Sequence, residues 1–395
     1  MRILKFIGCL LALTNMSIAQ LSPTADQVLE MRAALEQHIE AQTGQGGGHP
    51  RIGGLVRLAF HDCVGGCDGC VNLANPDNDG LRPYIRDLED VYANFEGIIS
   101  RADFWQLAGL EALERAAGTD RPDIPFLVGR IDCSTSPDTS DVEAFPTNGG
   151  HGNLGNVLDF FQSGFNLGER DAVAILGAHT LGRARTGASG FNGPWVRNED
   201  LFDNAYYRDL LDENLMWIQT NINPTGEDRW QWVHGRAGGR RGKRQAGGGG
   251  PMMLNSDMCL VKDITADSDG RSSCNYFSCA DSPTFSIVEE YANNNALWVS
   301  EYSRAHTIMT SNGYGEGDLA SVAEAIMVGN PEEQPLNTDE EAEEEELIEV
   351  IDAIMTGGTN EGEQPPRGGS GGRRGSGLRR GGPGRGGAGG RRRQR

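Results

Sequence analysis

The sequence predicts a mainly α-helical fold. Apolar residues recur at helical spacing in several segments, whereas segments that alternate apolar and polar residues are scarce. At 395 residues, the chain is long enough to bury a substantial core, in one large domain or two ordinary ones.

Residues 1–19 are typical of a secretory signal peptide. Basic residues precede an apolar core from Ile7 to Leu13, and Ser17-Ile18-Ala19 is a small-residue cleavage site that would leave Gln20 first. We therefore expect a secreted, extracellular protein, the alternative being an uncleaved N-terminal helix. The apolar run is too short to span a bilayer and no other segment is a candidate, so we expect no transmembrane segment.

Helical periodicity organises the chain that follows. Residues 24–44 form an amphipathic pattern with an N-cap candidate at the start, and a glycine-rich break at 46–50 separates it from the apolar run 55–60. Asn166 is the expected cap of a helix over 169–183, and residues 126–130 have the character of a short strand. Further helices are predicted over residues 81–96, 102–117, 157–165, 201–218 and 284–312.

The cysteines suit an oxidising compartment. Cleavage of the signal peptide removes Cys9 and leaves seven cysteines, at positions 63, 67, 70, 133, 259, 274 and 279. The odd count implies a free thiol or an intermolecular bond. The close spacing of Cys63, Cys67 and Cys70 is also typical of metal ligands, but secretion favours disulfides. The connectivity of these disulfides stays open.

Charge is distributed in opposing blocks. The chain has a net charge of −21, and because residues 367–395 carry ten arginines and no acid, the remainder carries −31. This acidity argues against nucleic acid as the main partner of the folded part. We expect a Gly/Arg-rich loop over 235–250 with a dibasic processing motif, an acidic disordered segment over 329–366 and a Gly/Arg-rich disordered tail over 367–395. The tail is a candidate ligand for acidic extracellular polymers, the alternatives being pairing with the acidic run or a solvated tail.

The segment Arg57-Leu58-Ala59-Phe60-His61-Asp62-Cys63 places a cation and a base four residues apart. On a helix, such residues lie on one face. A histidine that is neutral near pH 7, beside a permanent cation, suits a reaction in which a proton moves while negative charge develops. A single histidine in an apolar run is more often a core residue, so the function depends on a second motif.

That motif is Leu176-Gly177-Ala178-His179-Thr180-Leu181-Gly182. Four further segments of the chain, together with these two motifs, occur in the same order as the motifs of one known family. They are Pro76 to Gly80 around Asn78, Gly129-Arg130-Ile131-Asp132, Phe191 to Trp195, and Met253 to Asp257. Together they resemble the haem peroxidase superfamily of plants, fungi and bacteria over roughly residues 25–315.

The resemblance implies a two-lobed helical haem peroxidase domain over residues 20–328, with haem b between a distal and a proximal lobe. His179 would ligate the iron and donate its other N–H to Asp257, which keeps the imidazole basic. On the opposite side, His61 would act as general base and then general acid on hydrogen peroxide, with Arg57 stabilising developing charge. Asn78 would fix the tautomer of His61, and Phe60 would contact the haem.

The proximal side resembles the intracellular branch of cytochrome c and ascorbate peroxidases. Trp195 follows His179 at the spacing of the tryptophan that carries a cation radical in that branch, the alternative being a plain core residue. Phe60 stands where that branch has tryptophan, and Asp62-Cys63 resembles the secreted plant branch. A catalase-peroxidase, which needs a distal tryptophan, is therefore disfavoured.

The reducing substrate is less defined. Ala188 replaces the arginine that ascorbate peroxidases use at the haem edge, so ascorbate is disfavoured and a small phenol or other one-electron donor is expected. The alternatives are an oxidase of Fe²⁺ or Mn²⁺ and a matrix or binding protein that uses the domain as a scaffold. The resemblance also implies candidate cation sites for K⁺ or Ca²⁺. The proximal candidates are Thr180, Asn198 and Asp203, and the distal Ca²⁺ candidates are Asp62 and Asp68, in a loop one residue shorter than in secreted plant enzymes.

Overall fold

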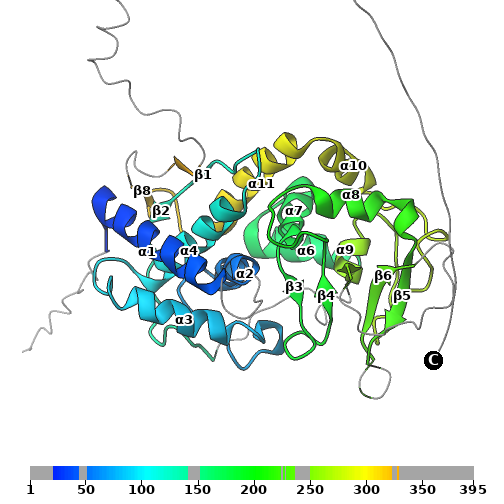
Figure 1. The fold of residues 1–395 in the computed structure, drawn as a ribbon, viewed down its shortest axis with the longest axis horizontal. Helices are drawn as coiled ribbons and strands as arrows, with labels where there is room; N and C mark the ends of the chain where they lie inside the picture. Colours follow the sequence, from blue (N-terminus) through cyan, green and yellow to red (C-terminus); the bar gives the residue numbers. More distant parts are fainter. Residues whose placement is uncertain are drawn as a thin grey trace, which may run out of the picture. The chain divides into compact units, whose positions relative to one another are not determined.

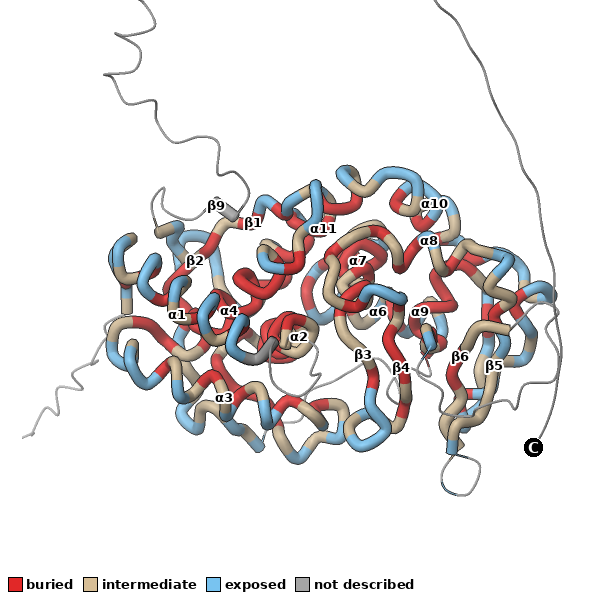
Figure 2. Tube along the Cα trace, viewed as in Figure 1, coloured by how far each residue is buried: buried red, intermediate tan, exposed pale blue. Residues whose placement is uncertain are grey.

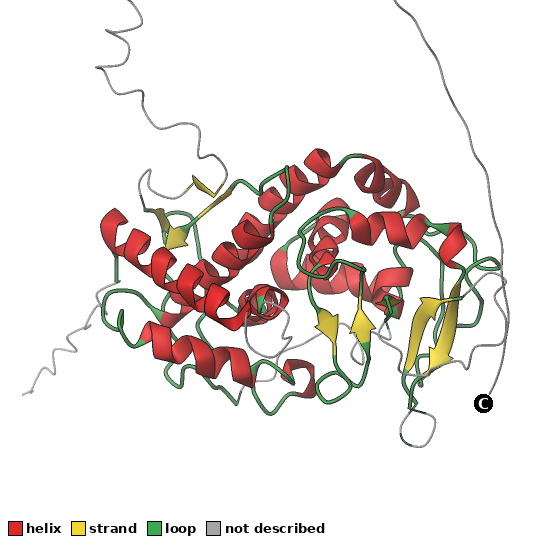
Figure 3. Cartoon of the chain, in the orientation of Figure 1, coloured by secondary structure: helices red, strands yellow, loops and turns green. Residues whose placement is uncertain are grey.

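A computed structural model describes residues 21–43, 51–140, 152–223, 226, 228–235, 250–322 and 327–328. This part of the chain is mostly helical with small sheets, which confirms the predicted class (Figure 3). The predicted signal peptide, nearly all of the loop over 235–250, the acidic segment and the Gly/Arg tail lie outside the described residues. Their boundaries remain predictions.

The helices follow the predicted order, with differences at their ends (Figure 1). They are α1 (Ala25–Thr43), α2 (Ile52–Cys63), α3 (Arg82–Tyr92), α4 (Arg101–Ala116), α6 (Leu154–Phe165), α7 (Glu169–Leu176), α8 (Ala205–Leu211), α9 (Asn255–Met258), α10 (Phe285–Asn293) and α11 (Asn295–Thr310). The 3₁₀ turns of the described residues lie between them and are η1 (Pro76–Asn78), η2 (Gly177–Thr180) and η3 (Glu213–Leu215).

Two predicted helices were wrong in detail. Asn166 does not cap α7; it ends α6 in the left-handed conformation, with φ of 55°, and Gly168 is the N-cap of α7. The helix expected over 169–183 ends at Leu176 and continues as the turn η2. The helix expected over 284–312 is broken at Asn294, whose extended backbone ends α10 and whose side chain caps α11.

A small antiparallel sheet replaces the end of the helix predicted over 201–218. Strands β5 (Trp217–Asn221), β6 (Trp230–His234) and β7 (Met252–Met253) pair in that order. The remaining strands form two-residue pairs: β1 (Ile124–Pro125) with β9 (Met327–Val328), β2 (Leu127–Val128) with β8 (Ala320–Ser321), and β3 (Arg183–Ala184) with β4 (Gly193–Pro194). Strand β2 lies inside the short strand predicted over 126–130.

Helix α2 contacts several other helices in the core. Helix α2 packs closely against α4, and α11 contacts α2 as well as α7 and α10. Gly109 of α4 permits the close approach, because a Cβ atom there would lie 2.7 Å from the Cβ of Ala59. Most of α4 and the apolar side of α2 are buried (Figure 2). Burial of each large apolar side chain contributes about 1.5–3 kcal/mol, so this packing fixes the position of α2.

The start of α2 also touches the turn that follows His179. A Cβ on Gly53 would lie 2.7 Å from the Cα of Gly182, and Gly182 itself has φ of +75°. Two glycines therefore allow the two backbones to meet, which places the distal and proximal segments in one region. Among the described residues, no helix combines the length and the hydropathy that a bilayer-spanning segment needs.

Candidate active site

Arg57 and His61 lie one turn apart on α2, as their spacing predicts. His61 is buried, and its Nδ1 lies 2.6 Å from the Oδ1 of Asn78 in the turn η1. The amide of Asn78 donates through Nδ2 to the carbonyl oxygen of Asn72 at 2.9 Å, so its Oδ1 is the acceptor for the imidazole. His61 therefore carries its proton on Nδ1, and the lone pair of the neutral ring is on Nε2.

The surroundings keep His61 neutral. Burial lowers its pKa well below the ordinary value of 6.5, and the charge of Arg57 lowers it further. His179 makes a smaller contribution in the same direction. A neutral base is consequently present throughout the physiological pH range.

Arg57 is held by the same loop that positions Asn78. Its guanidinium donates to the carbonyl oxygens of Asp77 at 2.6 Å and Asp79 at 3.0 Å, on either side of Asn78. Burial lowers the pKa of Arg57 to about 10, so the group stays cationic at neutral pH. The distal base and the distal cation are therefore fixed through one short segment.

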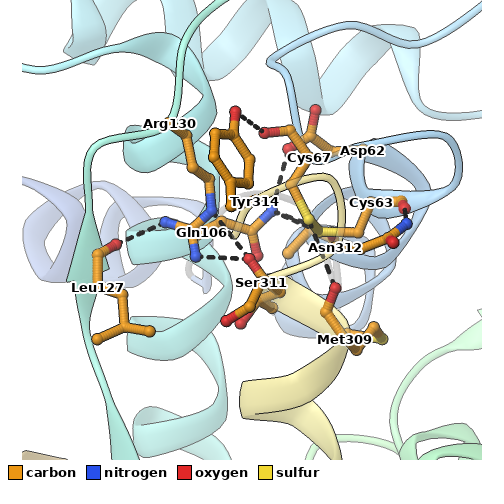
Figure 4. Close-up of a disulfide and its surroundings, with 12 residues drawn as sticks. Asp62, Cys63, Cys67, Gln106, Leu127, Arg130, Met309, Ser311, Asn312 and Tyr314 are labelled. Carbon is orange, nitrogen blue, oxygen red and sulfur yellow. Dashed lines mark hydrogen bonds between the residues drawn. A yellow bond between two sulfur atoms is a disulfide. The ribbon is translucent and has the colours of Figure 1, made fainter. Parts of the chain in front are cut away.

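A disulfide fixes the end of α2 just beyond His61 (Figure 4). Cys63 is bonded to Cys67, and the loop after α11 contacts both residues. Asn312 donates to the carbonyl oxygen of Cys63 at 3.0 Å, and Tyr314 donates to that of Cys67 at 3.3 Å. The other disulfides are Cys70–Cys133 and Cys274–Cys279, and Cys259 is a buried free thiol, so the described cysteines form bridges rather than a metal site.

Asp62, a predicted cation ligand, faces the protein interior. Its Oδ1 accepts from the backbone N–H of Cys70 at 3.1 Å and its Oδ2 from Gln106 at 3.0 Å. Burial raises the pKa of Asp62 to about 8, and the charge of Asp68 adds to the rise. The structure brings no set of three or more histidine, cysteine or acidic side chains together among the described residues. A distal Ca²⁺ site stays a prediction.

Phe60 packs in an aromatic cluster beside the distal histidine. Its ring meets that of His61 edge to face with centroids 5.5 Å apart. It also contacts Phe160, Phe161 and Phe165 of α6 at centroid distances of 6.0 to 6.3 Å. The predicted contact between Phe60 and a cofactor is untested, but the cluster shows how α6 supports this side of the site.

The proximal histidine is oriented by a buried carboxylate. His179 lies in η2, and its Nδ1 is 2.6 Å from Oδ1 of Asp257, which is fully buried at the start of the chain's short helix α9. Because a carboxylate accepts, Nδ1 carries the proton and Nε2 holds the lone pair. No hydrogen-bond partner for Nε2 is found among the described residues, and the side chain is 32% exposed. The ring is thus held by the carboxylate at Nδ1, and its side chain is partly exposed.

Trp195 shares the same carboxylate. Its Nε1 donates to Oδ2 of Asp257 at 2.9 Å, and its ring stacks on that of His179 with centroids 4.3 Å apart and planes inclined by 25°. The backbone N–H of Leu254 donates to the same Oδ2 at 2.7 Å. The structure therefore assembles His179, Trp195 and Asp257 as the sequence predicts.

Tyr206 is a site residue that the sequence analysis missed. It is fully buried in α8, and its hydroxyl donates to Oδ1 of Asp257 at 2.9 Å. Its ring meets that of His179 nearly at right angles, with centroids 6.1 Å apart. In the sequence it is one of two adjacent tyrosines in a helical pattern, which nothing distinguishes from core residues.

Two of the three proximal cation candidates, Thr180 and Asp203, come near each other. The Oγ1 of Thr180 lies 3.4 Å from Oδ1 of Asp203, and the backbone carbonyl of Asn198 accepts from the N–H of Leu201. The other oxygen of Asp203 pairs with Arg208 at 3.2 Å. A K⁺ or Ca²⁺ ion at this place remains a prediction.

The segment Gly129-Arg130-Ile131-Asp132 has a structural role. The fully buried Asp103 pairs with the guanidinium of Arg130 at 2.7 Å and accepts the backbone N–H of Gly129 at 2.7 Å. The carboxylate of Asp132 accepts the first N–H groups of α4. These contacts tie the segment to the helix that packs on α2.

Comparisons with known proteins agree with this geometry. A family model described as peroxidase matches residues 31–268, which is more than half of the chain. The chain is 32% identical over 222 residues to a mitochondrial cytochrome c peroxidase of Neurospora crassa, covering 53% of this chain and 55% of the relative. It is 35% identical over 182 residues to the cytosolic L-ascorbate peroxidase 2 of Arabidopsis thaliana, covering 42% of this chain and 68% of the relative. It is 37% identical over 169 residues to the peroxisomal L-ascorbate peroxidase 5 of the same plant, covering 40% of this chain and 57% of the relative.

The matched region thus spans between about half and two thirds of the length of these relatives. Their names differ in the electron donor, so they do not indicate a common reducing substrate. The family model, the predicted motifs and the assembled site agree on one point: the chain belongs to the peroxidase family.

Proposed function

We propose that the protein is a haem peroxidase that reduces hydrogen peroxide to water and oxidises a small one-electron donor. The observation that carries this proposal is a pair of histidines whose surroundings suit two different roles, one as a base and one as a metal ligand. His61 is a buried neutral base held by Asn78, and His179 is a ligand-like imidazole held by Asp257. The helix that carries His61 meets the turn that follows His179 at Gly53 and Gly182, which supports the assignment of both histidines to one site.

The proximal residues fit a haem iron. The side chain of His179 is 32% exposed, and its Nε2 has no hydrogen-bond partner among the described residues. Its Nδ1 is bonded to a carboxylate, as in most metal-ligating histidines. His179 would hold the iron, and Phe60 would contact the porphyrin. Bound haem would supply a redox-active iron that takes up oxidising power from peroxide and passes it to donors in one-electron steps.

The distal residues move the protons. Nε2 of His61 would take the proton from one oxygen of hydrogen peroxide and return it to the other, which leaves as water. Arg57 would stabilise the negative charge that develops on the departing oxygen. Asn78 accepts a hydrogen bond from Nδ1–H of His61. The proton therefore stays on Nδ1, and the lone pair stays on Nε2, the atom that would perform the transfer.

We further propose that the donor is a small phenol or a similar neutral reductant. The residue at the place where ascorbate peroxidases carry a cationic side chain is Ala188, which offers no charge for an anionic donor. The same position would not prevent oxidation of Fe²⁺ or Mn²⁺. Donor comparison is therefore part of the test.

Secretion is also proposed. Residues 1–19 have the features of a signal peptide, and the described residues form three disulfides, bonds that persist in oxidising compartments. Expression of the full chain in eukaryotic cells should release protein whose N-terminus is Gln20. Retention inside the cell with an intact Met1 would contradict this part of the proposal.

The enzymatic proposal can be tested with purified protein and hemin. The wild-type chain should take up haem and react with hydrogen peroxide in stopped-flow experiments, and the oxidised enzyme should be reduced faster by phenols than by ascorbate. Fe²⁺ and Mn²⁺ are tested in parallel, and preferential reduction by either ion would favour a metal oxidase. His179→Ala should lose stable haem binding. Haem retention equal to that of the wild type would refute the ligand assignment, and haem binding without peroxide turnover in the wild type would favour a scaffold.

A further inference from the structure

The carboxylate of Asp257 receives four hydrogen bonds, two on each oxygen. Oδ2 accepts from Trp195 at 2.9 Å and from the backbone of Leu254 at 2.7 Å. Oδ1 accepts from His179 at 2.6 Å and from the hydroxyl of Tyr206 at 2.9 Å. His179 and Tyr206 therefore use the same oxygen atom.

We propose that Tyr206 is a positioning residue that weakens the hydrogen bond between Asp257 and His179 and thereby raises the reduction potential of the iron. This inference rests on the proposed function, because it assumes that His179 holds a haem iron. It concerns the phenol of Tyr206, which has no role in the proton transfers described above.

The physical argument concerns the charge on one oxygen. A donor on a carboxylate oxygen stabilises its negative charge, so a second donor has less charge available to it. A weaker pull on Nδ1–H leaves the imidazole of His179 less electron-rich. A less electron-rich ligand stabilises the ferric state less strongly, because hydrogen bonds to the ligand tune both its basicity and the iron.

Tyr206 is suited to this task because it stays a donor at every working pH. Burial raises its pKa well above the ordinary value of 10, and the charge of Asp257 raises it further. The hydroxyl is fully buried and lies at the second residue of α8. No competition with solvent is therefore expected for this hydrogen bond.

The neighbouring residue provides a matched control. Tyr207 is equally buried, but its hydroxyl donates to the backbone carbonyl oxygens of Val173 at 2.7 Å and Ala174 at 3.2 Å. These carbonyls lie in the last turns of α7, and that of Ala174 also accepts the backbone N–H of Gly177. Tyr207→Phe thus removes a buried phenol hydroxyl without altering the hydrogen bonds of Asp257.

The test compares midpoint potentials of the haem-loaded proteins by spectroelectrochemistry. Tyr206→Phe should lower the potential, and Tyr207→Phe should leave it unchanged. A threefold change in the reduction equilibrium is the smallest shift that supports the proposal, which is about 28 mV for a one-electron couple at 59 mV per tenfold. The iron–histidine stretching frequency of the ferrous protein should rise in Tyr206→Phe only, because a stronger proximal hydrogen bond strengthens the metal–ligand bond.

A second measurement covers the case in which Tyr206→Phe does not fold. Incorporation of 3-fluorotyrosine in place of Tyr206 makes the phenol a stronger donor, so the potential should rise. An unchanged potential, a shift of opposite sign in either protein, or an equal shift in Tyr207→Phe would overturn the inference while leaving the proposed function intact. A wild-type chain that binds no haem would overturn both.

Discussion

Replacement of His61 by leucine tests the distal chemistry most directly. Leucine fills a similar buried volume, so the main losses are the base and its 2.6 Å hydrogen bond to Asn78. General acid–base catalysis is typically worth about 10²–10⁴ in rate, and at 1.36 kcal/mol per tenfold this corresponds to roughly 3–5 kcal/mol of activation free energy. Loss of this hydrogen bond to a buried acceptor costs about 1–3 kcal/mol, which is less than the roughly 5–15 kcal/mol that stabilises a typical domain, so the variant should remain folded.

The assay is the second-order rate of reaction between hydrogen peroxide and the haem-loaded protein. His306→Leu is the matched control, because His306 is also buried and burial lowers its pKa to about 3, yet it lies on α11 outside the site. His61→Leu should bind haem normally and react about 10²–10⁴ times more slowly, whereas His306→Leu should react like the wild type. A rate for His61→Leu within about threefold of the wild type, with haem bound, would refute the role of His61 as the proton carrier.

Three further results are expected. Removal of the cation in Arg57→Leu should raise the pKa of His61, so the acidic limb of the pH–rate profile should move to higher pH, and an unshifted limb would show that the two groups are not coupled. Asp103→Ala should destabilise the protein by about 3–5 kcal/mol in denaturant unfolding, because it leaves Arg130 buried without its partner; a loss below about 1 kcal/mol would mean that water compensates the charge. Cys259 should not react with a thiol reagent in the folded protein and should react after unfolding without reductant; rapid labelling of the folded protein would contradict its burial.

The distal segment was predictable because its information is local. Four-residue spacing places Arg57 and His61 on one face of any helix, and the apolar residues around them determine that the helix is buried. The pairing of His61 with Asn78 came from family resemblance alone, and the structure places the two side chains in contact. No sequence pattern reveals that Arg57 binds the carbonyl oxygens on either side of Asn78, since backbone acceptors carry no residue signature.

Helix ends were less predictable because the same residue type occurs at both the N-terminus and the C-terminus of helices. Asparagine caps helix N-termini and also adopts the left-handed conformation that ends helices, and Asn166 does the second. Residues 217–218 were predicted as the end of a helix, but they lie in β5 (Trp217–Asn221), which pairs with β6 (Trp230–His234). Pairing between segments is tertiary information, which overrides local propensity. The connectivity of the disulfides is unpredictable for the same reason.

The proximal site shows where sequence reasoning stops and why. A fully buried carboxylate is tolerated only if hydrogen bonds compensate its charge, so Asp257 requires several donors. Family resemblance identifies His179 as one of them and places Trp195 near the charge of Asp257, but adjacent Tyr206 and Tyr207 are chemically equal in the sequence. Successive residues on a helix point about 100° apart, so only one of the two can reach the carboxylate. The packing of α8 turns Tyr206 toward Asp257 and Tyr207 toward the end of α7, and the strength of the proximal hydrogen bond therefore depends on a contact that only the assembled fold creates.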